Sequence, residues 1–295
     1  MGRKKSLFYG SATAIVTPFK NGQVDYPSFG ELIDYQLHSG TDAIVILGTT
    51  GEASTIYENE RSEIITFAKR KIGGKLPLIV GTGSNATSVA IKYSKMAEAL
   101  GADGCLVVTP YYNKSTERGL TEHFKAIAKS VKIPIVLYNV PSRTGVSISM
   151  NVYDSLSRID SIVAVKEASG DVSYLTELIS RHGDSFDVYS GCDELTLSAL
   201  TLGGKGVISV VSNIVPSYMH QLCCEFRDGN LEKSRELQLF LTPLIKEMFK
   251  EVNPIPVKTA LSLMGMCENE FRLPMCKSTR ARQILSTLRS YSLVK

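Results

Sequence analysis

Short runs of apolar residues recur along the first 211 residues, each bounded by glycine, proline or polar residues. Nearly continuous apolar runs of this length are typical of parallel strands buried on both faces. Successive runs begin about 20 to 34 residues apart, the length of one β/α unit. The predicted strands begin near Ala12, Ala43, Pro77, Gly104, Pro134, Ile162, Phe186 and Gly206.

The segments between these runs have helical periodicity and helix-start residues. In the first, Tyr26-Pro27-Ser28 precedes an apolar stripe of Phe29, Leu32, Ile33 and Leu37. Eight strands alternating with such helices predict an α/β protein with a parallel (β/α)8 TIM barrel. A doubly wound open sheet is the main alternative, but no GxGxxG follows the first strand. Further helix starts fall at Glu58, Thr87, Thr116 and Asp171.

No strand pattern follows Val211, and the last part of the chain has only helical periodicity. Helices are predicted over 231–250, 256–266 and 278–291, with a break at Asn253-Pro254-Ile255-Pro256. We therefore expect a catalytic barrel domain over 1–224 and a small helical domain over 225–295.

Composition and charge argue against several classes of function. The chain is 43% hydrophobic, and its net charge of +4 comes from basic residues spread along it, which gives nucleic-acid binding little support. The basic Met1–Lys5 stretch is not followed by a signal-peptide core, and no segment is apolar enough to cross a membrane. We expect a soluble, cytoplasmic protein with reduced cysteines, no metal site and no membrane partner.

Lys166 is the most informative residue of the chain. It ends the apolar run Ile162-Val163-Ala164-Val165, and alternation places it on the face of Ala164 and Ile162. A lysine carried into a barrel interior is costly, although a lysine that reaches solvent or pairs with Glu167 would also fit the pattern. Tyr138 ends the preceding strand with the same inward parity, so amine and phenol should face one reacting atom.

These groups suit Schiff-base chemistry. A neutral lysine amine can attack a carbonyl, and burial disfavours the charged ammonium form. Tyr138 would carry the proton, with Thr49 as a relay hydroxyl, although Thr49 alone could equally be a turn residue. Thr50 and Gly51 lie in a turn that can present N–H groups to a carboxylate. Arg143, on the loop after Tyr138, could hold a second carboxylate or simply lie exposed.

Eight segments in order form a specific pattern: AIVTPF (14–19), GTTGE (48–52), GTGSNAT (81–87), VTPYYN (108–113), LYNVPSRTG (137–145), VAVKEASG (163–170), GGKGVISV (203–210) and NPIPVK (253–258). Together they resemble the dihydrodipicolinate synthase family of the N-acetylneuraminate lyase superfamily, over nearly the whole chain. By this resemblance, Lys166 forms the imine with pyruvate, and Tyr138, Thr49 and Tyr112 form the proton relay. Tyr112 would reach into the site of a neighbouring subunit, whereas chemistry alone favours a hydrophobic rim for this residue.

The resemblance also implies the substrates and the assembly. Thr50 would contact the pyruvate carboxylate, and Arg143 would anchor the carboxylate of aspartate semialdehyde. Ile208 would offer a main-chain carbonyl, and Gly191 would form a pocket wall. The implied reaction is condensation of the two substrates to 4-hydroxy-tetrahydrodipicolinate, the first committed step of diaminopimelate and lysine biosynthesis. It needs no external cofactor, and members of the family usually form homotetramers that are dimers of dimers.

The same residues also fit other functions. A sister aldolase, such as N-acetylneuraminate lyase or a 2-keto-3-deoxy-sugar acid aldolase, shares the lysine and tyrosine chemistry. Arg143 favours the synthase, because a sugar substrate needs hydroxyl partners rather than a second cation. A non-catalytic keto-acid-binding protein would not need Lys166, Tyr138 and Thr49 together. A pyridoxal enzyme lacks support, because no phosphate cradle is evident.

One departure from the family concerns regulation. Lysine-inhibited members carry histidines and a carboxylate in an interface pocket, where this chain has Glu58, Arg61 and Val89, with Asn85 and Tyr111 retained. Val89 cannot pair with an ammonium group and Arg61 repels one. We predict weak or absent inhibition by lysine in a steady-state assay. Strong inhibition at low lysine concentration would contradict this prediction.

Overall fold

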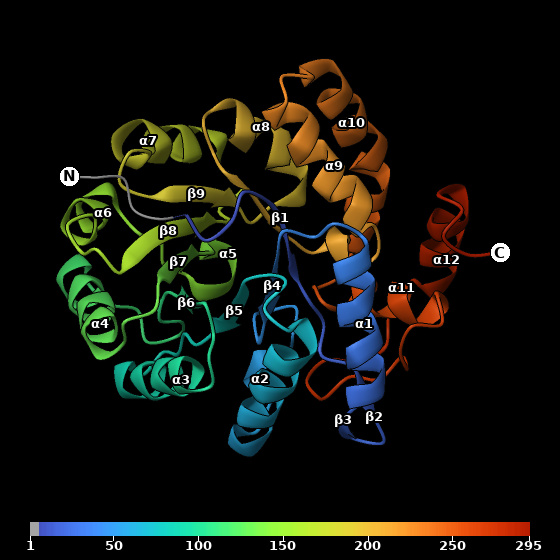
Figure 1. The fold of residues 1–295 in the computed structure, drawn as a ribbon, viewed down its shortest axis with the longest axis horizontal. Coiled ribbons are helices and arrows are strands. Elements are labelled where there is room, and N and C mark those ends of the chain that lie inside the picture. Colours follow the sequence, from blue (N-terminus) through green and yellow to red (C-terminus); the bar gives the residue numbers. More distant parts are fainter. Residues whose placement is uncertain (1–5) are drawn as a thin grey trace.

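The eight predicted strands close into a parallel barrel in this computed structural model, which describes residues 6–295. The basic Met1–Lys5 stretch lies outside the described residues. The order around the barrel is β1-β10-β9-β8-β7-β6-β5-β4, so the barrel prediction is confirmed over the open sheet (Figure 1). The strands are β1 (Gly10–Ala14), β4 (Ala43–Ile46), β5 (Leu78–Gly81), β6 (Gly104–Val108), β7 (Ile135–Asn139), β8 (Ile162–Glu167), β9 (Asp187–Ser190) and β10 (Gly206–Ser209).

Helices surround the barrel, and the predicted helix starts are found close to where the sequence placed them. The side chains of Asp25, Thr116 and Asp171 cap helix N-termini by accepting backbone N–H bonds. The helices are α1 (Tyr26–His38), α2 (Glu58–Ile72), α3 (Thr87–Ala99), α4 (Glu117–Ser130), α5 (Pro141–Thr144), α6 (Met150–Leu156), α7 (Val172–His182), α8 (Thr196–Thr201) and α9 (Pro216–Arg227).

Three more helices follow α9, namely α10 (Leu231–Met248), α11 (Ile255–Leu263) and α12 (Ala281–Ser290). They lie together beside the barrel, next to α9 and α1 (Figure 1). The sequence missed the short antiparallel hairpin of β2 (Phe19–Lys20) and β3 (Gln23–Val24), because its strands are too short to show a period.

Two apolar cores lie on the two sides of the strands. Inside the barrel, small and branched side chains such as Ala12, Val45 and Ala164 pack together, while the larger outer core lies between strands and helices. The predicted alternation holds for Ala164 and Lys166 but is wrong for Ile162, which packs outside, and Val163, which packs inside. The reason is an irregularity in the β7–β8 register, where Ile135 pairs with Ile162 and Val136 with Ala164.

Gly81, at the end of β5, lets the loop after β4 bend across the top of the barrel. A Cβ at this position would lie 1.9 Å from the main-chain oxygen of Leu47, which is far inside van der Waals contact. Leu47 itself has φ of +53°, a conformation that costs energy in a branched residue. The loop that carries Thr49 and Thr50 therefore depends on a glycine in the neighbouring strand.

A buried ion pair ties this loop to the C-terminal helices. Lys258 in α11 is 0% exposed, and its Nζ donates to Oε1 of Glu52 at 2.6 Å. The same nitrogen lies 4.0 Å from the ring centroid of Phe19. Burial lowers the pKa of the Lys258 amine, while the Glu52 carboxylate opposes that shift. Glu52 has φ of +53°, so the pair also holds an unfavourable backbone conformation.

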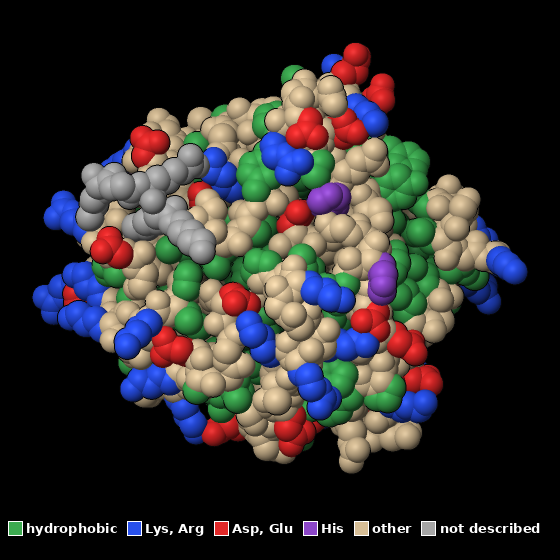
Figure 2. All heavy atoms as spheres, in the orientation of Figure 1, with side chains coloured by type: hydrophobic (Ala, Val, Ile, Leu, Met, Phe, Trp, Pro, Cys, Tyr) green, Lys and Arg blue, Asp and Glu red, His purple; other side chains and the backbone are tan. Residues whose placement is uncertain are grey.

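Acidic and basic side chains are interspersed over the face drawn in Figure 2, consistent with the spread of charge in the sequence. In residues 6–295 we find no helix with the length and hydropathy that a membrane span requires.

We predict that Lys258→Met lowers the free energy of unfolding by about 3–5 kcal/mol, because Glu52 is left buried and unpaired. The double variant Glu52→Gln/Lys258→Met should lose less than the sum of the two single changes. Urea unfolding gives these values, with Lys125→Met at the exposed Lys125–Glu122 pair as a control that should cost under about 1 kcal/mol. Equal costs at the two pairs would contradict the prediction.

Candidate functional site

Lys166 and Tyr138 lie side by side inside the barrel. They are register partners at the carboxyl ends of β8 and β7, as the sequence predicted. Lys166 is 5% exposed, and its Nζ lies 4.5 Å from the centroid of the Tyr138 ring. The alternative of an ion pair with Glu167 does not hold, because the Glu167 carboxylate accepts from Asn139 Nδ2 and the Ser169 N–H instead.

Gly191 gives the Lys166 side chain its space. A Cβ at Gly191 would lie 2.9 Å from Cε of Lys166 and 2.6 Å from Cβ of Ala168. The N–H of Gly191 donates to the main-chain oxygen of Glu167, which holds this turn against β8. Any residue larger than glycine at position 191 would displace the Lys166 side chain. Gly191, which was predicted to form a pocket wall, therefore packs directly against that side chain.

Two further ionisable groups follow Gly191. Burial raises the pKa of the Cys192 thiol to about 12, so this thiol stays protonated at neutral pH. Burial also raises the pKa of the Asp193 carboxyl, against hydrogen bonds from Ser209 and two backbone N–H groups and against the positive charge of Lys166. Oδ1 of Asp193 has no hydrogen-bond partner among the described residues. A buried carboxyl with one unpaired oxygen therefore lies near Lys166.

The loop after β4 carries the other predicted polar residues. Thr49 lines the cavity in front of Tyr138, whereas Thr50 is buried and its Oγ1 accepts from Nδ2 of Asn253 at 3.0 Å. The carbonyl of Gly51 accepts from Oγ1 of Thr17 at 2.8 Å. These bonds fix the loop from both sides.

Arg143 extends from α5 on the other side of the cavity. One of its guanidinium nitrogens, Nη2, donates to the main-chain oxygen of Asn253 at 3.0 Å, while the residue itself is exposed. Asn253 thus contacts both predicted carboxylate-binding residues, Arg143 and Thr50. Its own Oδ1 has no hydrogen-bond partner among the described residues.

Two predicted residues lie apart from this group within the chain. Ile208 is fully buried in the barrel interior, on the strand that pairs with β1. Tyr112 is 92% exposed, with φ of +71°, and does not line the cavity. The structure thus places Lys166, Tyr138, Thr49, Thr50 and Arg143 around one region and Tyr112 outside it.

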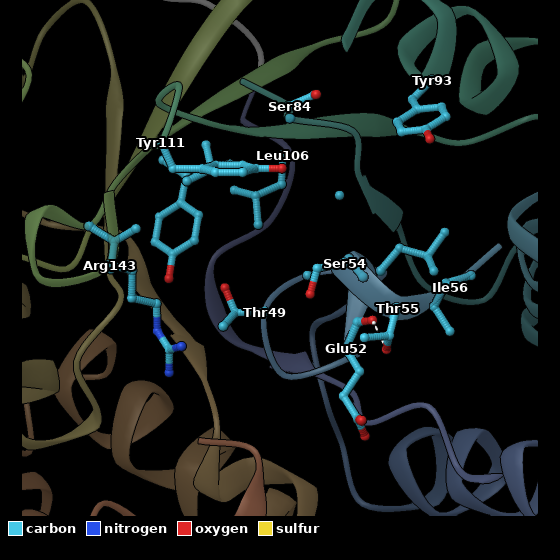
Figure 3. Close-up of a pocket in the computed structure, with 18 of the residues that line it drawn as sticks. Thr49, Glu52, Ser54, Thr55, Ile56, Ser84, Tyr93, Leu106, Tyr111 and Arg143 are labelled. Carbon is cyan, nitrogen blue, oxygen red and sulfur yellow. Dashed lines mark hydrogen bonds between the residues drawn. The ribbon is translucent and has the colours of Figure 1, made fainter. Parts of the chain in front are cut away.

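A cavity of about 360 Å³ is lined by Thr49, Tyr138 and Arg143. The Lys166 amine lies behind this lining, 4.5 Å from the centroid of the Tyr138 ring. Figure 3 shows Arg143 and Tyr111 at one end of the cavity, Tyr93 and Ile56 at the other, and Thr49 between them.

The sequence did not indicate Asn253, Asp193 or the Glu52–Lys258 pair as parts of the site. Asn253 and Lys258 belong to the NPIPVK segment, which was interpreted as a break between helices and as part of the family resemblance, with no role for either side chain. The sequence signal that could have pointed to the Glu52–Lys258 pair was Lys258, a lysine two residues after the proline-rich break. Asp193 follows Gly191 and Cys192 in a short polar stretch that offers no pattern of its own.

Comparison with known proteins agrees with the fold. Residues 7–288 match the model of the dihydrodipicolinate synthetase family. The 4-hydroxy-tetrahydrodipicolinate synthase of Acetivibrio thermocellus is 49% identical over 99% of this chain and 100% of its own. The crystal structure of dihydrodipicolinate synthase from Aquifex aeolicus is 45% identical, covers 97% of this chain and 99% of its own, and superposes with a TM-score of 0.95.

A second similar structure was solved with a bound ligand. The chloride-inhibited dihydrodipicolinate synthase from Acinetobacter baumannii, solved as a complex with pyruvate, is 41% identical. It covers 97% of this chain and 99% of its own, with a TM-score of 0.94. The family match spans both the barrel and the C-terminal helices, and the relatives match over nearly their full length. The chain belongs to the dihydrodipicolinate synthetase family.

Proposed function

We propose that this chain is a lyase that condenses pyruvate with L-aspartate 4-semialdehyde to 4-hydroxy-tetrahydrodipicolinate, in the synthesis of diaminopimelate and lysine. The observation that carries the proposal is the amine of Lys166 in contact with the Tyr138 ring inside the closed barrel. The close relatives are synthases of this name, and the chemistry uses no cofactor.

The reaction begins when Nζ of Lys166 attacks C2 of pyruvate, and loss of water leaves an imine. Loss of a proton from C3 then gives an enamine, whose C3 attacks the aldehyde carbon of the second substrate. The substrate's own amine finally adds to C2 and expels Lys166, which returns as a free amine. Each step moves a proton near C2 or C3, and Tyr138 with Thr49 can carry it.

The two carboxylates are held on opposite sides of the cavity. Thr50 and Gly51 lie on the loop after β4, where the pyruvate carboxylate would bind, and Ile208 would offer its main-chain carbonyl to the same substrate. Arg143 keeps unused N–H donors beyond its bond to Asn253, and these suit the carboxylate of aspartate semialdehyde. A hydroxyl-rich sugar would leave this guanidinium without a counter-charge, which favours the synthase over a sister aldolase.

Tyr112 completes the relay from a neighbouring subunit in this proposal. Its exposure and its positive φ support that role, because a strained, exposed tyrosine is otherwise unexplained. The working form is then at least a homodimer, and we infer a dimer of dimers in the cytoplasm. The division into a barrel domain over 1–224 and a helical domain over 225–295 remains part of the proposal.

The substrate assignment predicts the products. Pyruvate with aspartate semialdehyde should give the cyclic product, and pyruvate with N-acetylmannosamine should give none, as read by mass spectrometry. Arg143→Gln should raise KM for aspartate semialdehyde about 10-fold or more and leave pyruvate binding nearly unchanged, because a charged hydrogen bond contributes about 1.5–3 kcal/mol. Turnover of N-acetylmannosamine, or equal effects on the two substrates, would refute the assignment.

The proton-carrier role predicts the effect of removing one hydroxyl. Tyr138→Phe keeps the ring beside Lys166 but should lower kcat about 10²- to 10⁴-fold, the usual range for general acid–base catalysis. Tyr35→Phe is a matched control, because its hydroxyl donates to the Ile214 carbonyl far from the cavity, and it should keep kcat. A Tyr138→Phe enzyme with normal kcat would exclude the relay.

The shared site predicts complementation between two inactive variants. Tyr112→Phe and Lys166→Ala should each lose most activity, and co-expressed subunits should regain activity well above either variant alone. In a mixed dimer, one site has its own Lys166 and receives an intact Tyr112 from its partner. Tyr57→Phe, which changes another exposed tyrosine, is the control and should keep full activity. Failure of the mixture to recover would place Tyr112 outside the neighbouring site.

A further inference from the structure

Asp42, His220 and Cys224 form a hydrogen-bonded row at the end of the barrel opposite to Lys166. Asp42 directly precedes β4, whereas Lys166 lies near the carboxyl end of β8, and all the barrel strands are parallel. His220 and Cys224 lie one turn apart in α9, which packs against β1. None of the three residues lines the cavity described above. The row is therefore separate from the proposed reaction site.

The bonds of the row determine which ring nitrogen of His220 carries a proton. Nδ1 of His220 lies 2.9 Å from Oδ2 of Asp42, and Nε2 lies 3.3 Å from Sγ of Cys224. An ionised carboxylate only accepts hydrogen bonds, so Nδ1 donates to Asp42 and Nε2 keeps a lone pair for the thiol proton. The same carboxylate oxygen also accepts from the Ser11 N–H at 2.8 Å. Nucleophile, base and orienting carboxylate thus follow one another in the order that activates a thiol.

Two glycines leave the space that Asp42 and His220 occupy. A Cβ at Gly10 would lie 2.2 Å from Oδ2 of Asp42, and a Cβ at Gly40 would lie 3.1 Å from Cδ2 of the His220 ring. The side chains of His220 and Asp42 are 32% and 19% exposed, and Cys224 is half-buried. The backbone therefore holds the carboxylate and the imidazole in place while a small molecule from solvent can still reach the row.

The pKa shifts within the row favour transfer of a proton from Cys224 to His220 during a reaction. The hydrogen bond to Asp42 raises the pKa of the His220 imidazole above its ordinary value, against the effect of burial. Burial raises the pKa of the Cys224 thiol, while the positive charge of Arg227 opposes that shift. The resting thiol is therefore uncharged, and the thiolate forms when its proton moves to Nε2.

The other ionisable groups around the row do not change charge near neutral pH. Burial raises the pKa of the two that are neutral there, the phenol and the second thiol, and the three charged ones form ion pairs. These groups are Tyr9, Cys223, Glu225, Arg227 and Asp228. His220 is therefore the group of the row whose charge changes near neutral pH.

We propose that Cys224 is a reactive thiol that exchanges with small disulfides, with His220 as its base and Asp42 as the group that orients the base. Sγ attacks one sulfur of the disulfide, and a new S–S bond forms as the old one breaks, while the thiol proton passes to Nε2 of His220. The leaving thiolate then takes this proton. Cys224 is thereby oxidised to a mixed disulfide, and the other half of the reagent is reduced to a free thiol. The inference does not depend on the reaction proposed above.

Oxidised glutathione is a suitable probe, because peptide mapping by mass spectrometry gives the rate of adduct formation at each cysteine of the whole protein. Cys276 is the internal comparison, since it is exposed and, within residues 6–295, has no hydrogen bond to a histidine. At neutral pH, Cys224 should react at least 10-fold faster than Cys276 although it is less exposed, and dithiothreitol should remove the adduct. An adduct that forms as fast on Cys276 would overturn the proposal.

The pH dependence of the unchanged protein tests the role of His220. The rate at Cys224 should fall as the pH drops through a midpoint above the ordinary histidine pKa, because a protonated Nε2 cannot accept the thiol proton and Asp42 raises the pKa of this ring. A rate that instead rises only at alkaline pH, as for a thiol without a base, would overturn the proposal.

His220→Gln removes the base and keeps the thiol. It should lower the rate at Cys224 at least 10-fold at neutral pH and shift the rise of this rate to alkaline pH, while Cys276 keeps its rate. Circular dichroism and the melting temperature check the fold of this variant, and the pH profile of the unchanged protein still decides the matter if the variant does not fold. A Cys224 rate that His220→Gln leaves unchanged would show that the imidazole does not activate the thiol.

Discussion

A lysine amine held inside a closed ring of parallel strands, against the face of a phenol, is the constraint on which this structure depends. The amine is useful only if it can lose its proton, and water that reached it freely would keep it charged. The barrel excludes that water by placing Lys166 beside Tyr138, and Gly191 leaves the space in which the side chain lies.

The polar residues of the site are held in place by contacts between residues far apart in the sequence. Thr49 and Thr50 lie on a loop whose shape needs Gly81 in the next strand and the buried pair of Glu52 with Lys258. Asn253 then joins Thr50 to Arg143 through its side chain and its carbonyl. The C-terminal segment therefore positions the loops that carry Thr50 and Arg143 rather than merely covering the barrel, and a change in α11 should act on these loops through the same bonds.

Much of the fold follows from local pattern. The eight apolar runs became eight strands, because a parallel strand buried on both faces must be apolar along its length. Helix starts at Thr116 and Asp171 follow from side-chain caps that are visible in the sequence. The predicted parity, with Ile162 inward and Val163 outward, was wrong, because the irregular β7–β8 register depends on the partner strand. Sequence patterns also placed Lys166 and Tyr138 together, but contacts such as Asn253 with Thr50 join residues 203 positions apart and leave no local trace.

The most direct test of this account is borohydride reduction of the protein in the presence of pyruvate, followed by peptide mapping. Reduction should fix one pyruvate-derived mass on the peptide that contains Lys166, and Lys166→Ala should prevent it. The exposed lysines provide an internal comparison, because they should remain unmodified at the same pyruvate concentration. A pyruvate adduct spread over exposed lysines, or none on Lys166, would contradict the central claim that the barrel holds this amine ready to react.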